Sequence, residues 1–451
     1  MDSEDVGSID MRVDAITSYS ERVDSLIRSE TASFYGDSPL YTFASLVDSA
    51  IRSSFASYEA DYEPHSSTTT NVHSQELSLP DPHNNNPYYQ IVTQQPHFHH
   101  QSEGLNSTDG SKEENGLNGL SRKVSSLSML LTPQTDDEIL QSSKLKRFTF
   151  KELETATRSF RPSSMVGQGS FGTVFKGWID KKTLAPTKTG RGMAIAVKWR
   201  DPYCFFGYNE WLTEIKYLGQ LCHPNLVKLI GYSLKDDRQI LVYELMTKGS
   251  LDNHLFRRAS GCETLSWTIR MKVALDVAKG LAFLHSDEVD AIHRDFHTSH
   301  ILLNSNYNAK LSGFGLARNG PKGDENHVST RVMGTSGFVA PEYLATGHLT
   351  KKTDVYGFGV VLLELMSGKR VMDINRAKGE HNLVEWAIPL LIARKRISKV
   401  MDARIKGQYS DREEVKIAHL TIQCLSVEPK LRPTMDEVVR SLEHLQDTKD
   451  A

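Results

Sequence analysis

The sequence predicts an α+β protein in which strands precede helices, behind a long polar N-terminal extension. Between residues 166 and 246 the chain carries a glycine-rich hairpin pattern, then a strand that ends in a lysine, then a further pair of strands. From Asp354 onward the pattern is helical, and the first of these helices is almost wholly apolar, as expected of a buried helix. The strand-rich part is therefore expected to fold beside a larger helical part.

Composition limits the classes of protein that the chain can belong to. It has 451 residues, 39% hydrophobic content and a formal net charge of -3, which gives no general attraction to nucleic acid. No signal peptide or membrane-spanning segment is apparent, and Asp2 in place of glycine excludes N-myristoylation at this start. The four cysteines lie far apart without metal-type spacing. We expect a cytoplasmic protein without a transmembrane segment.

Residues 1–142 are interpreted as a mostly disordered extension. From about residue 60 the segment is rich in Ser, Thr, Asn, Gln, His and Pro, and it offers too little apolar surface to offset the entropy of ordering. A weak repeat relates residues 23–34 to 47–58, with apolar residues at helical spacing. The repeat indicates two short amphipathic helices, or chance similarity within a serine-rich tail.

A second domain is predicted over residues 148–446. Thr149, followed three residues later by Glu152, is a helix-capping pattern. The next motif is G-x-G-x-x-G-x-V over 167–174, and a strand ending in Lys198 follows it. Glycines without a Cβ allow backbone amides to approach phosphates closely, and the lysine strand behind them makes the pattern specific. These motifs predict a nucleotide-binding hairpin.

The centre of the domain resembles the catalytic centre of a protein kinase. His293, Arg294 and Asp295 match the start of a catalytic loop, and Ala-Pro-Glu over 340–342 matches the end of an activation segment. Three positions depart from the kinase pattern. The residues there are His297 for the phosphate-supporting lysine, His300 for a metal-binding asparagine and Gly313 for the metal-binding aspartate.

The wider sequence resembles the plant receptor-like cytoplasmic kinases, in the branch related to brassinosteroid- and immune-signalling kinases. The segments that carry this resemblance are Phe-Thr-Phe-Lys-Glu-Leu at 148–153, Glu-Trp-Leu-Thr-Glu at 210–214, His-Pro-Asn-Leu-Val-Lys-Leu-Ile-Gly-Tyr at 223–232 and Ser-Thr-Arg-Val-Met-Gly-Thr at 329–335. It implies a two-lobed kinase-like fold with a small, mainly β lobe and a larger helical lobe. It also implies an ion pair between Lys198 and Glu214, and another between Glu342 and Arg432.

The resemblance also assigns candidate site residues. Asp295 is the vestigial catalytic base, with Lys198 and Glu214 as its companions. The expected nucleotide contacts are Val166, Gly167, Gly169, Gly172, Val174, Ala196, Lys198, Glu244, Met246 and Leu302. The expected regulatory residues are Ser329, Thr330 and Thr335 of the activation segment, with Arg294 placed to pair with an added phosphate.

The substitutions predict lost or vestigial catalysis. Mg²⁺ requires hard oxygen ligands, which Gly313 and His300 do not supply. We expect weak, metal-independent ATP binding and no properly held Mg²⁺. The leading hypothesis is a pseudokinase acting as scaffold, decoy or allosteric partner in plant signalling and immunity. The alternatives are a slow or atypical Ser/Thr kinase, and a binding module located in the N-terminal extension.

Two further features bear on partners. His293, His297 and His300 have spacing that suits a metal, but in a kinase fold His293 points into the core, so no metal site is predicted. Aromatic residues precede the helix that bears Glu214. They offer a docking edge for an allosteric partner, or two or three of them fold inward against the small lobe. They are Tyr203, Phe205, Phe206 and Tyr208. The expected partners are other protein kinases or immune and receptor proteins, which could bring the chain to the plasma membrane.

Overall fold

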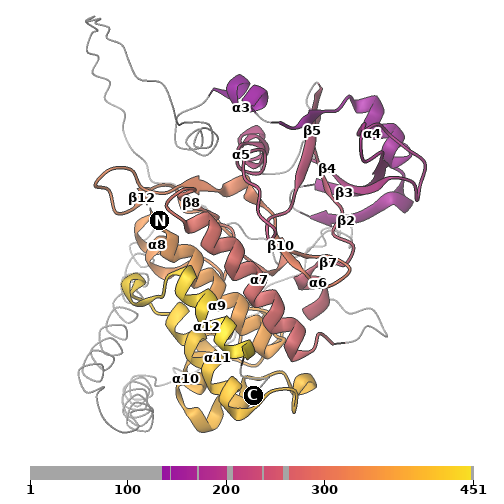
Figure 1. Cartoon of the computed structure of the whole chain (residues 1–451). Coiled ribbons are helices and arrows are strands. Elements are labelled where there is room, and N and C mark those ends of the chain that lie inside the picture. Colours follow the sequence, from indigo (N-terminus) through magenta and orange to yellow (C-terminus); the bar gives the residue numbers. More distant parts are fainter. Residues whose placement is uncertain are drawn as a thin grey trace, which may run out of the picture.

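A computed structural model describes residues 135–142, 144–169, 172–200, 207–235, 238–256 and 264–447. Within these ranges the chain forms a small sheet-containing lobe joined to a larger helical lobe (Figure 1). The fold class predicted from the sequence is confirmed. The repeat over 23–34 and 47–58, and the aromatic residues at 203–206, lie outside the described residues.

The small lobe is built on one six-stranded sheet with the order β1-β5-β6-β4-β3-β2. Its strands are β1 (Lys146–Arg147), β2 (Met165–Gly169), β3 (Gly172–Ile179), β4 (Met193–Trp199), β5 (Leu229–Lys235) and β6 (Arg238–Glu244). The central pairs β3–β4 and β4–β6 are antiparallel, with Val174 opposite Lys198. That register places the lysine beside the glycine-rich β2–β3 hairpin.

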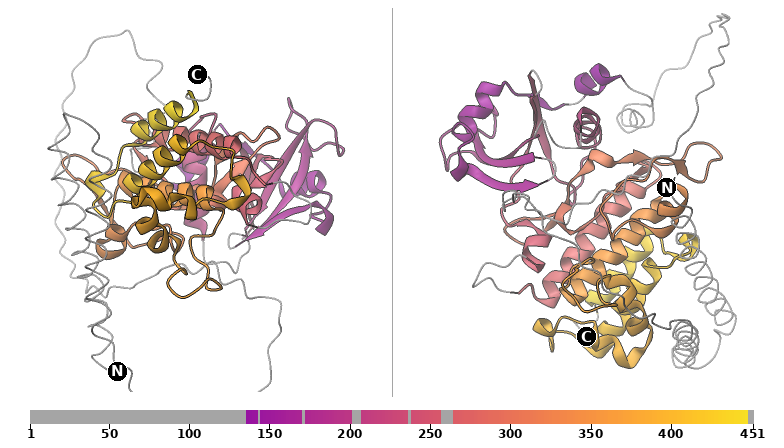
Figure 2. Two further views of the ribbon diagram at one scale, coloured as in Figure 1. Left: turned by 90° about the horizontal axis from the view of Figure 1, so that it is seen from below. Right: turned by 180° about the vertical axis from the view of Figure 1, so that it is seen from behind.

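Two helices flank this sheet. Helix α4 (Phe150–Thr157) begins with the predicted capping box, in which Thr149 and Glu152 exchange hydrogen bonds. Helix α5 (Tyr208–Leu218) carries Glu214 on a buried face, because its apolar residues recur at helical spacing. Both views of Figure 2 show the sheet lobe set to one side of the helical lobe.

Assignment of residues 136–142 to a disordered extension is wrong, since Asp136–Ser142 form helix α3. The helix contacts α5, and Ile139 is buried in the main hydrophobic core. The hydroxyl of Tyr232 also donates to the carbonyl of Leu140 at 3.3 Å. A helix of seven residues is not stable alone, so packing rather than local sequence forms it.

The larger lobe is built around helix α9 (Lys351–Ser367). Its residues are buried along nearly the whole length, which confirms the prediction of an apolar central helix. The surrounding helices are α6 (Leu251–Leu255), α7 (Trp267–His285), α8 (Pro341–Thr346), α10 (Leu383–Ile392), α11 (Asp411–Cys424) and α12 (Met435–Asp447). Among the described helices, none is both long and apolar enough to cross a lipid bilayer.

Short strands, which pair with one another, shape the loops of the larger lobe. One sheet has the order β10-β9-β7, and two further pairs are β11–β8 and β12–β13. Their bounds are β7 (Gly249–Ser250), β8 (Ala291–Ile292), β9 (Ile301–Leu303), β10 (Ala309–Leu311), β11 (Arg318–Asn319), β12 (Val328–Ser329) and β13 (His348–Leu349). The loop between β8 and β9 contains residues 293–300, which form the candidate site.

Candidate functional site

The loop between β8 and β9 is anchored to the buried helix α9. Asp354 accepts hydrogen bonds from the backbone N–H groups of His293 and Arg294, each at 2.8 Å. The same carboxylate lies 2.9 Å from His285 Nε2 on α7. A buried carboxylate that accepts several bonds holds its neighbours firmly, so the loop has little freedom to change its course.

His293 belongs to the core rather than to the open side of the loop. Its side chain is fully buried, Nε2 donates to the carbonyl of Ser312 at 3.0 Å, and its ring meets Phe314 edge-on at 4.9 Å between centroids. This is the orientation that argued against a three-histidine metal site. Leu218 and Leu229 are likewise buried, and together with Phe314 they belong to the main core.

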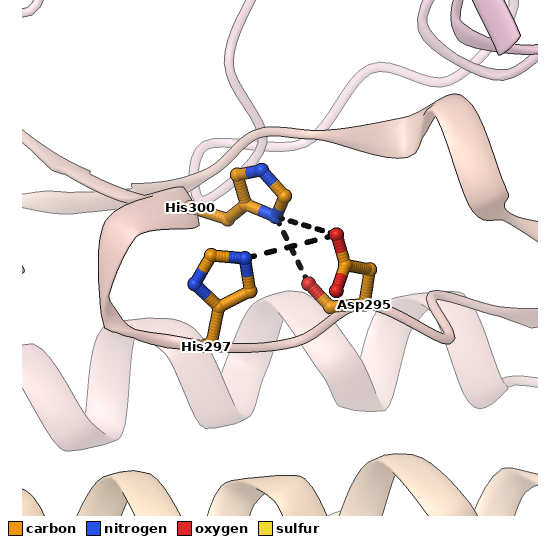
Figure 3. Close-up of side chains that lie close together, drawn as sticks. All are labelled: Asp295, His297 and His300. Atoms are coloured by element: carbon orange, nitrogen blue, oxygen red, sulfur yellow. Dashed lines mark hydrogen bonds and ion pairs between the residues drawn. The ribbon is translucent and has the colours of Figure 1, made fainter. Parts of the chain in front are cut away.

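Asp295, His297 and His300 converge on one point beyond the core (Figure 3). Asp295 Oδ2 lies 3.7 Å from His297 Nε2 and 3.6 Å from His300 Nδ1. The other carboxylate oxygen, Oδ1, accepts a hydrogen bond from the hydroxyl of Thr335 at 2.7 Å. His300 Nδ1 also donates to the backbone carbonyl of Asp295 at 2.9 Å. The candidate base is therefore enclosed by its neighbours.

Burial and neighbouring charge set the protonation of this cluster. Burial, reinforced by His297, lowers the pKa of His300 to about 3, so its ring is neutral at pH 7. Burial by itself would raise the pKa of Asp295, but the facing His297 and the Thr335 hydroxyl lower it below its usual range. Asp295 is accordingly a carboxylate held in place, and a weak base.

Gly313 and His300 share the place where a kinase holds its metal. Gly313 has a φ of 78°, in the left-handed region. A Cβ built on it would lie 2.5 Å from the Cγ, Nδ1 and Cε1 atoms of His300. The ring thus fills the space that a side chain at position 313 would need.

Magnesium does not fit the residues present at this point. Mg²⁺ requires near-octahedral oxygen coordination, whereas position 313 has no side chain and position 300 offers an imidazole whose Nδ1 is engaged with a carbonyl. Within the described part of the chain, the acidic group gathered with these histidines is Asp295.

The predicted pair between Lys198 and Glu214 is present. Lys198 Nζ on β4 lies 3.0 Å from Glu214 Oε2 on α5, and the glutamate side chain is only 5% exposed. This contact links the sheet to α5 across the small lobe. It is the arrangement expected of a kinase fold in which α5 is drawn inward.

Most of the other residues predicted to contact a nucleotide lie on strands β2, β3 and β4 of the sheet and on β9. Val174, Ala196 and Leu302 are half-buried, while Val166 is exposed on β2. A Cβ at Gly167 or Gly169 would meet no protein atom within 4 Å. Gly172 adopts a φ of 112°, which only glycine accepts readily. Packing therefore does not explain the first two glycines.

The last strand of the sheet leads into the segment between the lobes. The Glu244 side chain forms an ion pair with Lys310, with Nζ and Oε1 2.6 Å apart. It also accepts a hydrogen bond from the backbone N–H of Lys228. Met246 is buried in the main core. The backbone groups of these two residues are therefore the ones that an adenine could contact.

The activation segment is held to the catalytic loop through Arg294. Its guanidinium donates to the hydroxyls of Tyr343, at 2.9 Å, and Thr330, at 3.2 Å. Ser329 is exposed on β12, whereas the Thr335 hydroxyl is engaged by Asp295. Arg294 is therefore in direct reach of one predicted regulatory residue, Thr330.

Comparisons with known proteins place this geometry in a family. Residues 160–442 match the family model described as protein tyrosine and serine/threonine kinase. With the two-lobed fold, the Lys198–Glu214 pair and the anchored catalytic loop, the chain belongs to the protein kinase family.

Relatives narrow this class further. The chain is 61% identical to receptor-like cytoplasmic kinase 176 of Oryza sativa subsp. japonica over 327 residues, which cover 72% of this chain and 83% of the relative. It is 58% identical to serine/threonine-protein kinase BIK1 of Arabidopsis thaliana over 332 residues, which cover 74% of this chain and 84% of that relative. It is therefore a member of the receptor-like cytoplasmic kinases.

The sequence pattern identifies three departures from the kinase pattern, but not the cluster that two of them, His297 and His300, form with Asp295. Among the described residues, the metal-type grouping consists of Asp295, His297 and His300, and His293 is not part of it. The signal is present in the sequence as the spacing D-x-H-x-x-H, which includes a carboxylate as well as histidines. The loop path, rather than residue type, selects these three side chains.

Proposed function

We propose that this member of the family is a pseudokinase, a kinase fold that does not transfer phosphate at a useful rate. One observation carries the proposal. At position 313 no carboxylate is available for a metal ion, and the His300 ring lies where that side chain would project. Its relatives bear the names of kinases. We propose that this chain differs from them in activity because of the residues at positions 297, 300 and 313.

The expected loss of rate follows from the role of the metal and of positioned charge. Removing one preorganised electrostatic group costs ~10²–10³ in rate, or roughly 3–4 kcal/mol. The three changes cannot be multiplied, because they act on one assembly. From the ~1–100 per second of a competent kinase, turnover falls below ~0.01 per second.

The intact parts of the fold indicate what the protein does instead. The Lys198–Glu214 pair holds α5 against the sheet of the small lobe, and the core that includes Leu218, Leu229 and Phe314 joins this lobe to the larger one. A fold kept in this state suits a scaffold, a decoy or an allosteric partner. The partners proposed are receptor kinases, other protein kinases and immune proteins in plant signalling. The chain would act in the cytoplasm and reach the plasma membrane through those partners.

A slow or atypical Ser/Thr kinase is the second candidate. It is favoured by Asp295, which keeps its hydrogen bond from Thr335, and by the Lys198–Glu214 pair. A phosphotransfer assay with ATP, Mg²⁺ or Mn²⁺ and a general acceptor protein separates the two. We expect the phosphotransfer rate of the wild type to equal that of Asp295→Asn, with both rates at background. Wild-type turnover tenfold above that of Asp295→Asn would overturn the proposal.

Nucleotide binding supplies a second measurement. We propose weak ATP binding through the glycine-rich hairpin and Lys198, without a contribution from Mg²⁺. Calorimetric titration with and without Mg²⁺ should give the same affinity within a few-fold. If Mg²⁺ raised the ATP affinity more than about tenfold, ~1.4 kcal/mol, the account of positions 300 and 313 would be wrong.

A further inference from the structure

The cluster of Asp295, His297 and His300 has the composition and spacing of a metal site. One carboxylate and two imidazoles place their possible ligand atoms within 4.8 Å of one another. The two imidazole rings lie 4.1 Å apart between centroids and are tilted by 44°. Figure 3 shows both rings turning a nitrogen toward the Asp295 carboxylate. A mixed nitrogen and oxygen set of this kind suits borderline metals and not Mg²⁺.

We propose that Asp295, His297 and His300 form a binding site for a divalent transition metal ion, with Zn²⁺ as the reference ligand. The inference goes beyond the proposed loss of phosphotransfer and does not depend on it. The ion would take Asp295 Oδ2, His297 Nε2 and His300 Nδ1 as its three protein ligands. A fourth position is left for water or for a group from a partner.

The distances lie close to those that such an ion requires. With metal–ligand bonds of about 2.0–2.2 Å, ligands on a tetrahedral ion stand about 3.3–3.5 Å apart. Asp295 Oδ2 lies 3.7 Å from His297 Nε2 and 3.6 Å from His300 Nδ1. Closing by a few tenths of an ångström satisfies the geometry for these two pairs, and the ligand atoms of the two histidines, which lie within 4.8 Å of each other, must approach to the same range. His300 must also exchange its hydrogen bond with the Asp295 carbonyl for the metal.

Contacts with neighbouring residues hold two of the three ligands, Asp295 and His297, before any ion arrives. Thr335 donates to Asp295 Oδ1 at 2.7 Å, which leaves Oδ2 turned to the histidines. His297 lies against Phe338, with ring centroids 5.6 Å apart. The side chains of Asp295 and His297 are 4% and 5% exposed, and that of His300 is 12% exposed. Partners of this kind orient the ligands and raise metal affinity.

Metal binding would have a structural consequence. Because Thr335 belongs to the activation segment and donates to a ligand, an ion at Asp295 fixes that segment to the catalytic loop. The ion would also occupy the oxygen through which Asp295 could act as a base. The position of the activation segment is therefore expected to depend on whether metal is bound.

The test compares metal content by equilibrium dialysis of the full chain against buffered Zn²⁺, followed by elemental analysis. The variants are His297→Asn and His300→Asn, with Asp295→Asn as a third that keeps the shape of the side chain. The matched control is His327→Asn with His348→Asn, which removes a stacked histidine pair with centroids 3.6 Å apart elsewhere on the molecule. The histidines of residues 97–100 are common to all these chains and cancel in the comparison.

We expect the wild type and the control to bind one Zn²⁺ more than each variant, or to bind it at least tenfold more tightly. Zn²⁺ should raise the melting temperature of the wild type and of the control only. Co²⁺ should give the intense visible absorption of a four-coordinate ion, which the variants lose, and millimolar Mg²⁺ should not displace it. Equal Zn²⁺ binding by wild type and all three variants would overturn the proposal, as would no binding above that of Asp295→Asn.

Discussion

The ring of His300 lies where any side chain at position 313 would have to project. Three ring atoms would stand 2.5 Å from a Cβ on Gly313, well inside van der Waals contact. The two substitutions are therefore coupled by space as well as by chemistry. Adding a side chain at position 313 while His300 is kept creates a clash in a well-packed site.

The first prediction concerns restoration of phosphotransfer. Gly313→Asp alone should lower the free energy of unfolding by about 1–3 kcal/mol, because the new side chain meets the His300 ring. Adding His300→Asn should relieve that loss, and adding His297→Lys should then give measurable autophosphorylation. Thermal melts and phosphate incorporation measure the two effects.

The control for this series is the triple variant with Asp295→Asn, which should fall back to background. If the triple variant folds and still shows no autophosphorylation, the defect lies elsewhere, and the account of these three positions is insufficient. A Gly313→Asp protein as stable as the wild type would contradict the steric coupling.

The second prediction concerns phosphate on the activation segment. Thr330 already accepts a hydrogen bond from Arg294 at 3.2 Å, so a phosphate there would form a charge-assisted pair with the guanidinium. We expect phosphorylated Thr330 in protein from plant cells and slower proteolysis of residues 320–340 when it is present. Ser329→Ala should keep that protection, whereas Thr330→Ala should lose it. Phosphate found only in residues 1–142 would refute this regulation.

The third prediction concerns the bidentate pair between Glu342 and Arg432. The two contacts measure 2.7 and 2.6 Å, and the arginine is fully buried. Glu342→Ala leaves that charge without its carboxylate and should cost about 3–5 kcal/mol of unfolding free energy. Glu443→Ala is the control, since its pair with Lys279 is 45% and 41% exposed and is worth at most about 1 kcal/mol. Similar melting temperatures for the two variants would show that the pair does not support the fold.

The fourth prediction is a pH dependence of stability at Glu364 on α9. Burial raises the pKa of Glu364 to about 8, although Thr298 and the Val371 backbone both donate to its carboxylate. Its folded-state pKa lies above the unfolded value of 4.5. Its contribution to stability is therefore complete below the unfolded pKa and is lost as pH rises through about 8.

Glu364→Gln keeps the acceptor and the contact with Thr298 but removes the ionisation. Between about pH 5 and about pH 9, the free energy of unfolding of the wild type should fall by on the order of 2–4 kcal/mol more than that of the variant. Denaturant titrations across that range measure it, with the exposed Glu443→Gln as the control. Parallel curves for wild type and Glu364→Gln would exclude Glu364 as the titrating group.

Much of the site could be predicted because its signals are local in the chain. The glycine hairpin, the lysine strand and the His-Arg-Asp run each consist of adjacent residues, and Thr149 with Glu152 forms the predicted cap. The pair between Lys198 and Glu214 could be named because the family pattern fixes their order. No comparable local signal exists for α3, which packs against α5 and whose Ile139 is buried in the main core.

By itself the sequence determined the fold class, the helix caps and the three positions where the chain departs from its family. Each of these depends on residue type and spacing along one stretch of chain. Only the tertiary structure decided which neighbours those positions meet. His300 fills the space beside Gly313, Thr335 binds Asp295, and His297 rather than His293 completes the cluster. The physical reason is that α9, through Asp354, fixes the path of the catalytic loop, and that path sets where each side chain points.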